Sequence, residues 1–99
     1  MATKGAVKER TNNKVKEPKK YAVVMHNDDF TTMEFVVWVL VDIFHKDEIT
    51  ANEIMLTVHN KGKAVVGQYP YDIALTRVGN ALKRAKENGY PFRMTIEEA

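Results

Sequence analysis

The residues best suited to chemistry lie in a short polar stretch where a predicted strand gives way to a predicted helix. Asn27, Asp28 and Thr31 place carboxamide, carboxylate and hydroxyl oxygens within five positions of one another. Apolar Met33 and Val36 follow at once. A site built here could bind a positively charged group at one end and an apolar group at the other, because the oxygens accept hydrogen bonds and the neighbouring side chains bury carbon.

A second candidate group lies on a later predicted helix. Met55, Val58 and His59 stand at positions i, i+3 and i+4, so they share one helix face. Methionine and valine in that arrangement belong to a core more often than to a pocket, and a single histidine beside them is usually a structural group. The functional alternative is that the neutral ring of His59 accepts a hydrogen bond from an ammonium group. The pattern alone leaves both interpretations open.

A metal site is a further alternative, because His26, Asp28, Asp29 and His59 are residue types that bind metals. The two histidines, however, do not form an HxH or HxxxH motif, and neighbouring strand positions point to opposite faces. We therefore expect no metal and no other cofactor.

Catalysis is disfavoured by what the chain lacks. It contains no serine and no cysteine, and most of its threonines are accounted for as helix caps. Its five glycines stand singly, so no glycine-rich phosphate loop is present. Asp28 and Asp29 are adjacent and would diverge in a strand, rather than flank a bond to be cleaved. We expect a protein that is not an enzyme.

Length and composition limit the architecture. The 99 residues fit one domain, with 44% hydrophobic and 28% charged residues, an ordinary globular composition. The longest apolar run, residues 35–41, has seven residues, far fewer than the roughly 18 that a membrane span needs. The amino terminus lacks an apolar core followed by small residues, so we expect no secretory signal and no membrane association.

The charge is divided unequally along the chain. Residues 1–20 hold seven Lys or Arg and two Glu, a net charge of +5, whereas the remainder carries −3. The first segment has few apolar residues and no periodicity, so we expect a disordered basic extension over 1–20 and a core domain over 21–99. The extension could contact nucleic acid, could be engaged by a partner, or could be a solvated leader. Glutamates among its lysines make it a poor phosphate-binding stripe.

The elements that would position the candidate residues begin at residue 21. Residues 21–27 form a predicted strand, and residues 32 to 44 or 45 form a predicted helix, apolar almost all round and so central to the core. Thr31 followed three residues later by Glu34 predicts a capping box at its start.

A second capping box, Thr50 with Glu53, predicts a helix that runs to about residue 60. Gly62 is then placed to end this helix in a left-handed conformation.

The last third of the chain predicts a strand over 63–68, a helix with Pro70 in its first turn that runs to 88, and a strand over 92–96. Gly89 and Pro91 separate the last two elements. The order is β-α-α-β-α-β. It predicts a small α+β sandwich with three helices on one face of a three-stranded antiparallel sheet.

Three stretches resemble the ClpS adaptor family: NDDFTTMEFVV at 27–37, MLTVHNKGKAVVG at 55–67 and the closing YPFRMTIEEA. The resemblance covers about residues 21–99. It implies an adaptor that binds the free α-amino group and the bulky first side chain (Leu, Phe, Tyr or Trp) of N-degron substrates. It also implies delivery of these substrates to a Clp-family AAA+ unfoldase.

The resemblance also implies roles for individual residues. Asn27, Asp28 and His59 fall where the family binds the amino group, Asp28 partly through water. Six residues fall where the family lines the side-chain pocket: Thr31, Met33, Val36, Met55, Val58 and Phe92. Met33 occupies the position that disfavours β-branched first residues.

Two residues of the third predicted helix, Asp72 and Arg77, match positions implicated in docking to the amino-terminal domain of the unfoldase. The chain departs from the family at Thr32, where many members have proline, and at Phe92, which replaces a commoner aliphatic residue. Both changes could alter the pocket.

The leading interpretation is therefore a monomeric adaptor of the bacterial cytoplasm, without nucleic-acid partners. The extension has one arginine and no serine, unlike a plastid transit peptide. The alternative is a basic-tailed domain that binds nucleic acid or ribosomes, since the same element order resembles the carboxy-terminal domain of the bacterial ribosomal stalk protein.

Overall fold

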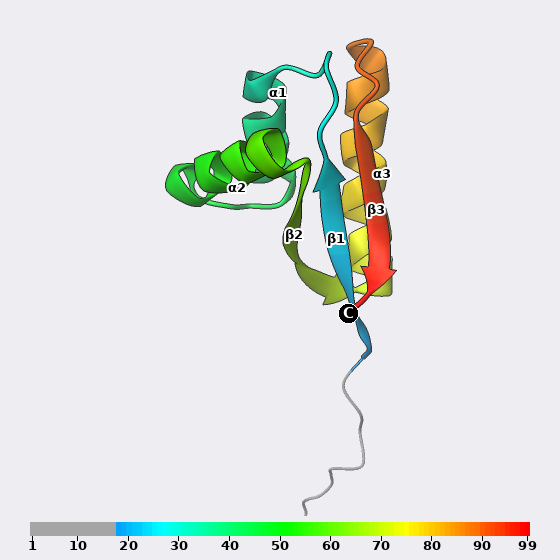
Figure 1. Cartoon of the computed structure of the whole chain (residues 1–99). Coiled ribbons are helices and arrows are strands. Elements are labelled where there is room, and N and C mark those ends of the chain that lie inside the picture. The colour runs from blue at the N-terminus through cyan, green and yellow to red at the C-terminus, as the bar shows by residue number, and fades with distance from the viewer. Residues whose placement is uncertain (1–17) are drawn as a thin grey trace, which may run out of the picture.

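The computed structural model describes residues 18–99, so most of the predicted extension over 1–20 lies outside the described residues. The sheet has three strands: β1 (Lys20–His26), β2 (Lys63–Pro70) and β3 (Arg93–Glu98). β1 lies in the middle and pairs antiparallel with both neighbours (Figure 1). Lys20 already belongs to β1, one residue before the predicted start of the core domain.

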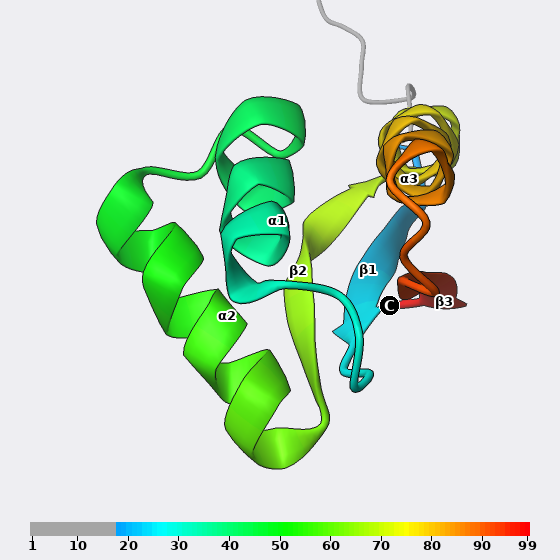
Figure 2. The same cartoon turned by 90° about the horizontal axis from the view of Figure 1, so that it is seen from above.

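The helices pack on this sheet in two groups. α3 (Tyr71–Glu87) packs along the sheet and contacts all three strands, whereas α2 (Glu48–Lys61) packs beside β2 and α1 (Met33–Trp38) packs against α2 (Figure 2). α1 continues directly into a π-helical turn, η2 (Val39–Ile43), so the first predicted helix has two parts. The predicted α+β class and the order β-α-α-β-α-β are confirmed.

The start of α1 differs from the prediction. Its N-cap is Thr32, whose hydroxyl accepts a hydrogen bond of 3.1 Å from the backbone N–H of Phe35. The predicted capping box of Thr31 with Glu34 is therefore wrong. The Thr31 hydroxyl instead donates to the carboxylate of Asp28 at 2.7 Å, because an ionised acceptor three residues earlier competes for it.

The start of α2 differs in the same way. The helix begins at Glu48, and its N-cap is Asp47, whose carboxylate accepts from the backbone N–H of Thr50 at 2.7 Å. The predicted box of Thr50 with Glu53 is therefore wrong, since Thr50 already lies in the first turn. A carboxylate is the stronger cap because its charge also interacts favourably with the helix dipole.

The helix ends follow the glycines. Gly62, with φ of +91°, is the left-handed C-cap of α2, as predicted. At the end of α3, Gly89 has φ of +75°, and the N–H of Tyr90 donates to the carbonyl of Ala85 at 2.9 Å. This is a Schellman arrangement. Pro70 stands at the N-cap of α3 rather than in its first turn.

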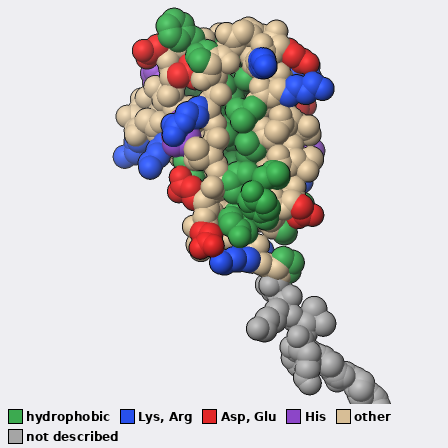
Figure 3. Space-filling view, turned by 90° about the vertical axis from the view of Figure 1, so that its right-hand side faces the viewer, with side chains coloured by type: hydrophobic (Ala, Val, Ile, Leu, Met, Phe, Trp, Pro, Cys, Tyr) green, Lys and Arg blue, Asp and Glu red, His purple; other side chains and the backbone are tan. Residues whose placement is uncertain are grey.

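The core lies between the sheet and the helices. Val23 and Met25 of β1 are fully buried in it with Val39 and Leu40 of η2, so the first predicted helix is central to the core as expected. Apolar side chains remain visible as a band on the side of the molecule where α3 lies beside β3 (Figure 3). No helix of the described part is both long enough and apolar enough to cross a membrane.

Candidate functional site

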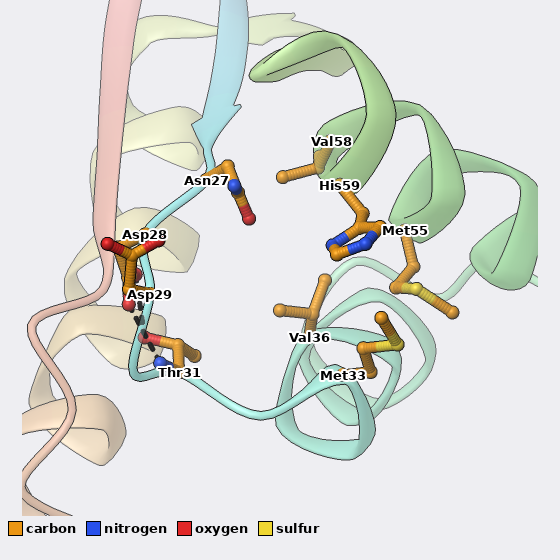
Figure 4. Close-up of a pocket in the computed structure, with 9 residues that line it drawn as sticks. All are labelled: Asn27, Asp28, Asp29, Thr31, Met33, Val36, Met55, Val58 and His59. Atoms are coloured by element: carbon orange, nitrogen blue, oxygen red, sulfur yellow. Dashed lines mark hydrogen bonds between the residues drawn. The ribbon is translucent and has the colours of Figure 1, made fainter.

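A cavity of about 280 Å³ opens between the segment after β1, α1 and α2 (Figure 4). Nine residues line it: Asn27, Asp28, Asp29, Thr31, Met33, Val36, Met55, Val58 and His59. Eight of them are the residues that the sequence and its family resemblance selected. Segments about 20 residues apart in the chain are thus brought to one place.

The cavity has a polar side and an apolar side. Figure 4 shows Asn27 and His59 pointing into the space from opposite sides, the first from the loop and the second from α2. Val36 and Val58 are buried, so carbon atoms close the apolar side. Met33 is 45% exposed, which places it at the rim of the cavity.

Asp28 shapes the polar loop. Its Oδ1 accepts from the backbone N–H groups of Phe30 (2.8 Å) and Thr31 (2.7 Å), and its Oδ2 accepts from the Thr31 hydroxyl. Partial burial would raise the pKa of Asp28, but the hydrogen bonds from Thr31 and Phe30 outweigh burial and hold the pKa below its usual value. Asp28 is therefore ionised at neutral pH, and Oδ2 retains a free lone pair for a ligand.

A backbone contact fixes Asn27 relative to α2. The N–H of Asn27 donates to the carbonyl of Gly62 at 2.9 Å, and the N–H of Gly62 donates to the carbonyl of Val58 at 2.9 Å. His59 belongs to the last turn of the same helix. The conformation of Gly62 therefore determines how Asn27 and His59 face each other.

This role of Gly62 leads to a stability prediction. Gly62→Ala is expected to lower the free energy of unfolding by about 1 kcal/mol, because a Cβ is strained at φ of +91° although the surrounding space is open. Gly79→Ala is the matched control: Gly79 lies exposed in the middle of α3, so alanine there should raise stability by up to about 1 kcal/mol. Urea titration of both variants measures the two changes. Equal shifts would contradict the role of Gly62.

The lining of the cavity differs from the predicted one at two residues, Phe92 and Asp29. Phe92, which the resemblance implied as a lining residue, is absent from the lining. It is buried, and its ring packs edge-on against Phe35 of α1, 5.7 Å between centroids. Asp29 lines the cavity, although the sequence suggested it only as a candidate metal ligand and not as a residue that binds the amino group. Its position in the same polar turn as Asp28 was the available signal.

The predicted docking residues lie away from the cavity, on α3. Asp72 is in the first turn of this helix, and the guanidinium of Arg77 lies 5.3 Å from the centre of the Tyr69 ring. Five positions on a helix separate two side chains by about 140°. Asp72 and Arg77 therefore do not share one helix face.

Comparisons with known proteins agree with this architecture. Residues 16–95 match the family described as ATP-dependent Clp protease adaptor protein ClpS. The ClpS adapter protein of Acetivibrio thermocellus is 47% identical over 97 residues, which cover 98% of each chain. That of Syntrophus aciditrophicus is 49% identical over 86 residues, 87% of this chain and 80% of the relative.

A solved structure, Agrobacterium tumefaciens ClpS2 bound to L-phenylalaninamide, is similar with a TM-score of 0.80 and 41% identity, covering 84% of this chain and 100% of that one. The fold, the matched motifs and these relatives lead to one assignment: the chain belongs to the ClpS family of Clp protease adaptors.

Proposed function

We propose that this protein binds the free α-amino group and the bulky first side chain of proteins destined for degradation, and delivers them to a Clp AAA+ unfoldase. The observation that carries the proposal is the single cavity that joins Asn27, Asp28 and His59 to an apolar side. The ligand of the Agrobacterium relative, L-phenylalaninamide, has a free α-amino group and a bulky aromatic side chain. The decisive test compares a Leu-first peptide with its amino-acetylated twin.

The chemistry of a chain's first residue matches the polar side. A free α-amino group has a pKa near 8 and is largely cationic at neutral pH, whereas an internal peptide nitrogen carries no charge. The Asn27 oxygen, the Asp28 carboxylate and a neutral His59 ring offer three acceptors for its three protons. Each charged hydrogen bond contributes about 1.5–3 kcal/mol net.

The apolar side supplies the rest of the affinity. Burying a Leu or Phe side chain contributes about 1.5–3 kcal/mol. After the cost of association, the two parts together should give at most micromolar affinity, about −8 kcal/mol. Neither part is sufficient alone, so recognition requires both a free amine and a bulky side chain.

Met33 lies at the rim of the cavity, and we propose that its side chain keeps β-branched first residues from entering. Met33→Ala should raise the affinity for Ile-first and Val-first peptides about tenfold relative to Leu-first peptides, because a steric exclusion is removed. Leu56→Ala is the control, since Leu56 is exposed on α2 but does not line the cavity. Peptide titration by fluorescence anisotropy measures the ratio, and an unchanged ratio in Met33→Ala would argue against this role.

Docking to the unfoldase is proposed to use the end of the molecule opposite the cavity. β1 starts at Lys20 and leads to Asn27, so roughly 23 Å of strand separates its start from the cavity. At that start, the Tyr21 ring lies 5.0 Å from the ring of Tyr71, the first residue of α3. Asp72, which follows Tyr71 in the first turn of α3, would then face the unfoldase.

Charge reversal tests this docking site. Asp72→Lys should weaken binding to the isolated amino-terminal domain of the unfoldase roughly tenfold at low salt, because a rim charge complementary to the partner is inverted. Asp42→Lys, which reverses an exposed charge in η2, should have little effect. Calorimetry with the unfoldase domain measures both. Equal affinities for the two variants would place docking elsewhere.

The proposal further describes a monomeric protein of the bacterial cytoplasm that has no catalytic activity of its own and no nucleic-acid partner. The bacterial relatives named above support the setting. An adaptor needs binding groups rather than a nucleophile, and the chain contains neither serine nor cysteine.

A further inference from the structure

A cluster of aromatic rings holds α1 against the segment that joins α3 to β3. Phe35 is at its centre: the Tyr90 ring meets it edge-on with 5.0 Å between centroids, and the Phe92 ring does so at 5.7 Å. The Trp38 ring stacks on the Phe35 ring, with 5.9 Å between the ring centroids. Such aromatic pairs stabilise beyond their buried area and prefer defined orientations. They therefore fix where Phe35, and with it α1, lies.

Tyr90 makes a second contact with the same helix. The hydroxyl of Thr32, the N-cap of α1, donates to the Tyr90 hydroxyl in a long hydrogen bond of 3.5 Å. The same Thr32 oxygen accepts from the N–H of Phe35 at 3.1 Å. Tyr90 thus contacts both the cap and the first turn of α1, from about 55 positions further along the chain.

The end of α3 determines where Tyr90 lies. Its backbone N–H donates to Ala85 at 2.9 Å, the N–H of Gly89 donates to Lys86 at 3.0 Å, and Gly89 adopts the left-handed conformation that this motif needs. Tyr90 therefore projects from a fixed helix end rather than from a free loop.

α1 transmits this position to the cavity. Even together with η2, its six residues extend only to Ile43, a helical segment too short to be stable without tertiary contacts. Phe35 lies between Met33 and Val36 in sequence, and both of these line the cavity. A displacement of Phe35 would therefore move the rim and the wall of the apolar side together.

We propose that Tyr90 is a specificity-determining positioning residue that sets the width of the apolar side of the cavity through Phe35 and Thr32. The inference rests on the proposed function, because the width matters only if a first side chain enters there. Phe92 supports Phe35 from another direction. It follows that residues outside the cavity determine how strictly bulky first residues are separated from β-branched ones.

The test compares Tyr90→Leu with wild type, using free-amine peptides that begin with Leu, Phe or Val. Tyr90→Leu keeps an apolar side chain but removes the edge-on ring and the hydroxyl. The ratio of the affinities for Leu-first and Val-first peptides should fall about threefold to tenfold. The effect is of this size because leucine and valine differ by one methylene group. Tyr90→Phe, which removes only the hydroxyl, should show a smaller fall. Ile96→Ala is the control, because Ile96 packs on the core from β3 opposite Val23.

A second readout separates positioning from general loss of stability. In Tyr90→Leu, the NMR methyl signal of Met33 should shift and that of Met55 should not. In Ile96→Ala, neither signal should shift. An affinity ratio in Tyr90→Leu equal to that of wild type, or a fall equally large in Ile96→Ala, overturns the inference. If wild type also bound an amino-acetylated peptide as tightly as a free one, the proposed function itself would fail, an outcome independent of the Tyr90 ratios.

Discussion

A Leu-first peptide whose α-amino group is acetylated is expected to bind at least about a hundredfold more weakly than the same peptide with a free amino group. Acetylation removes the positive charge and leaves one N–H where three were available. Losing two charged hydrogen bonds of about 1.5–3 kcal/mol each corresponds to this factor or more, because 1.4 kcal/mol is tenfold in affinity. Isothermal titration calorimetry of the two peptides measures it directly.

Two further peptides separate the parts of this effect. A peptide that starts with 4-methylpentanoyl keeps the leucine side chain but lacks the amino group, and it should lose affinity as the acetylated peptide does. A Gly-first peptide keeps the amine but lacks the side chain, and it should lose the roughly 1.5–3 kcal/mol of apolar burial. Equal binding by the free, acetylated and 4-methylpentanoyl peptides would show that the amine is not recognised.

Asp28→Asn is expected to weaken binding of the free-amine peptide by about tenfold to a hundredfold, whereas Asp29→Asn should weaken it only slightly. Both substitutions remove one carboxylate from the lining of the same cavity. Among the described residues, only Asp28 of the two is held in place by three hydrogen bonds, from the backbone N–H groups of Phe30 and Thr31 and from the Thr31 hydroxyl. A charged hydrogen bond to the ammonium group is worth about 1.5–3 kcal/mol, which sets the size of the effect.

Thermal unfolding of the two Asp variants provides the necessary check. An amide at position 28 can still accept from the two backbone N–H groups, so Asp28→Asn should remain folded and lose at most a modest part of its stability. If Asp29→Asn lost as much affinity as Asp28→Asn, binding would depend on the summed negative charge of the loop rather than on one aligned carboxylate.

The stability of the folded protein is expected to depend on pH at acidic values, because the pKa of Asp28 is lowered by folding. A carboxyl group whose pKa is lower in the folded than in the unfolded protein stabilises the fold above its ordinary value of 3.8, and this contribution is lost as the pH falls through the lower folded value. Asp28 therefore stays charged between pH 7 and 5. His59→Ala should bind the free-amine peptide weakly at both pH values, because the ring nitrogen that accepts a hydrogen bond from the ammonium group is absent.

The sequence predicted the fold and most of the residues that line the cavity, whereas both of its predicted capping boxes were wrong for the same physical reason. Both helix starts were misplaced because an Asp stands three residues before the threonine that was read as the cap, Asp28 before Thr31 and Asp47 before Thr50. In each case the carboxylate accepts from the threonine backbone N–H. A threonine–glutamate spacing is therefore a weak signal when a carboxylate precedes it, since the ionised group is the better acceptor.

Other features depend on contacts between distant segments. The spacing assigned Met55, Val58 and His59 to one helix face, and the residue types marked 27–36 as a second candidate site. That the two groups belong to one pocket came from the family resemblance. Phe92 could not be separated from the lining by its type, because an aromatic residue suits a pocket wall and a core equally well. Its packing against Phe35 becomes evident only when β3 and α1 are placed together.

The central position of β1 has a mechanical consequence. β1 is bonded along its length to β2 on one side and β3 on the other, and the chain enters the sheet at Lys20. A force on the amino-terminal end, directed along the strand, would load both hydrogen-bond ladders in shear, whereas a force on the carboxyl-terminal end would act on the edge strand β3. Optical-trap extension from the two ends should therefore give a higher rupture force for the amino-terminal attachment. A motor that held this protein by its amino-terminal end would meet the more resistant direction of the sheet.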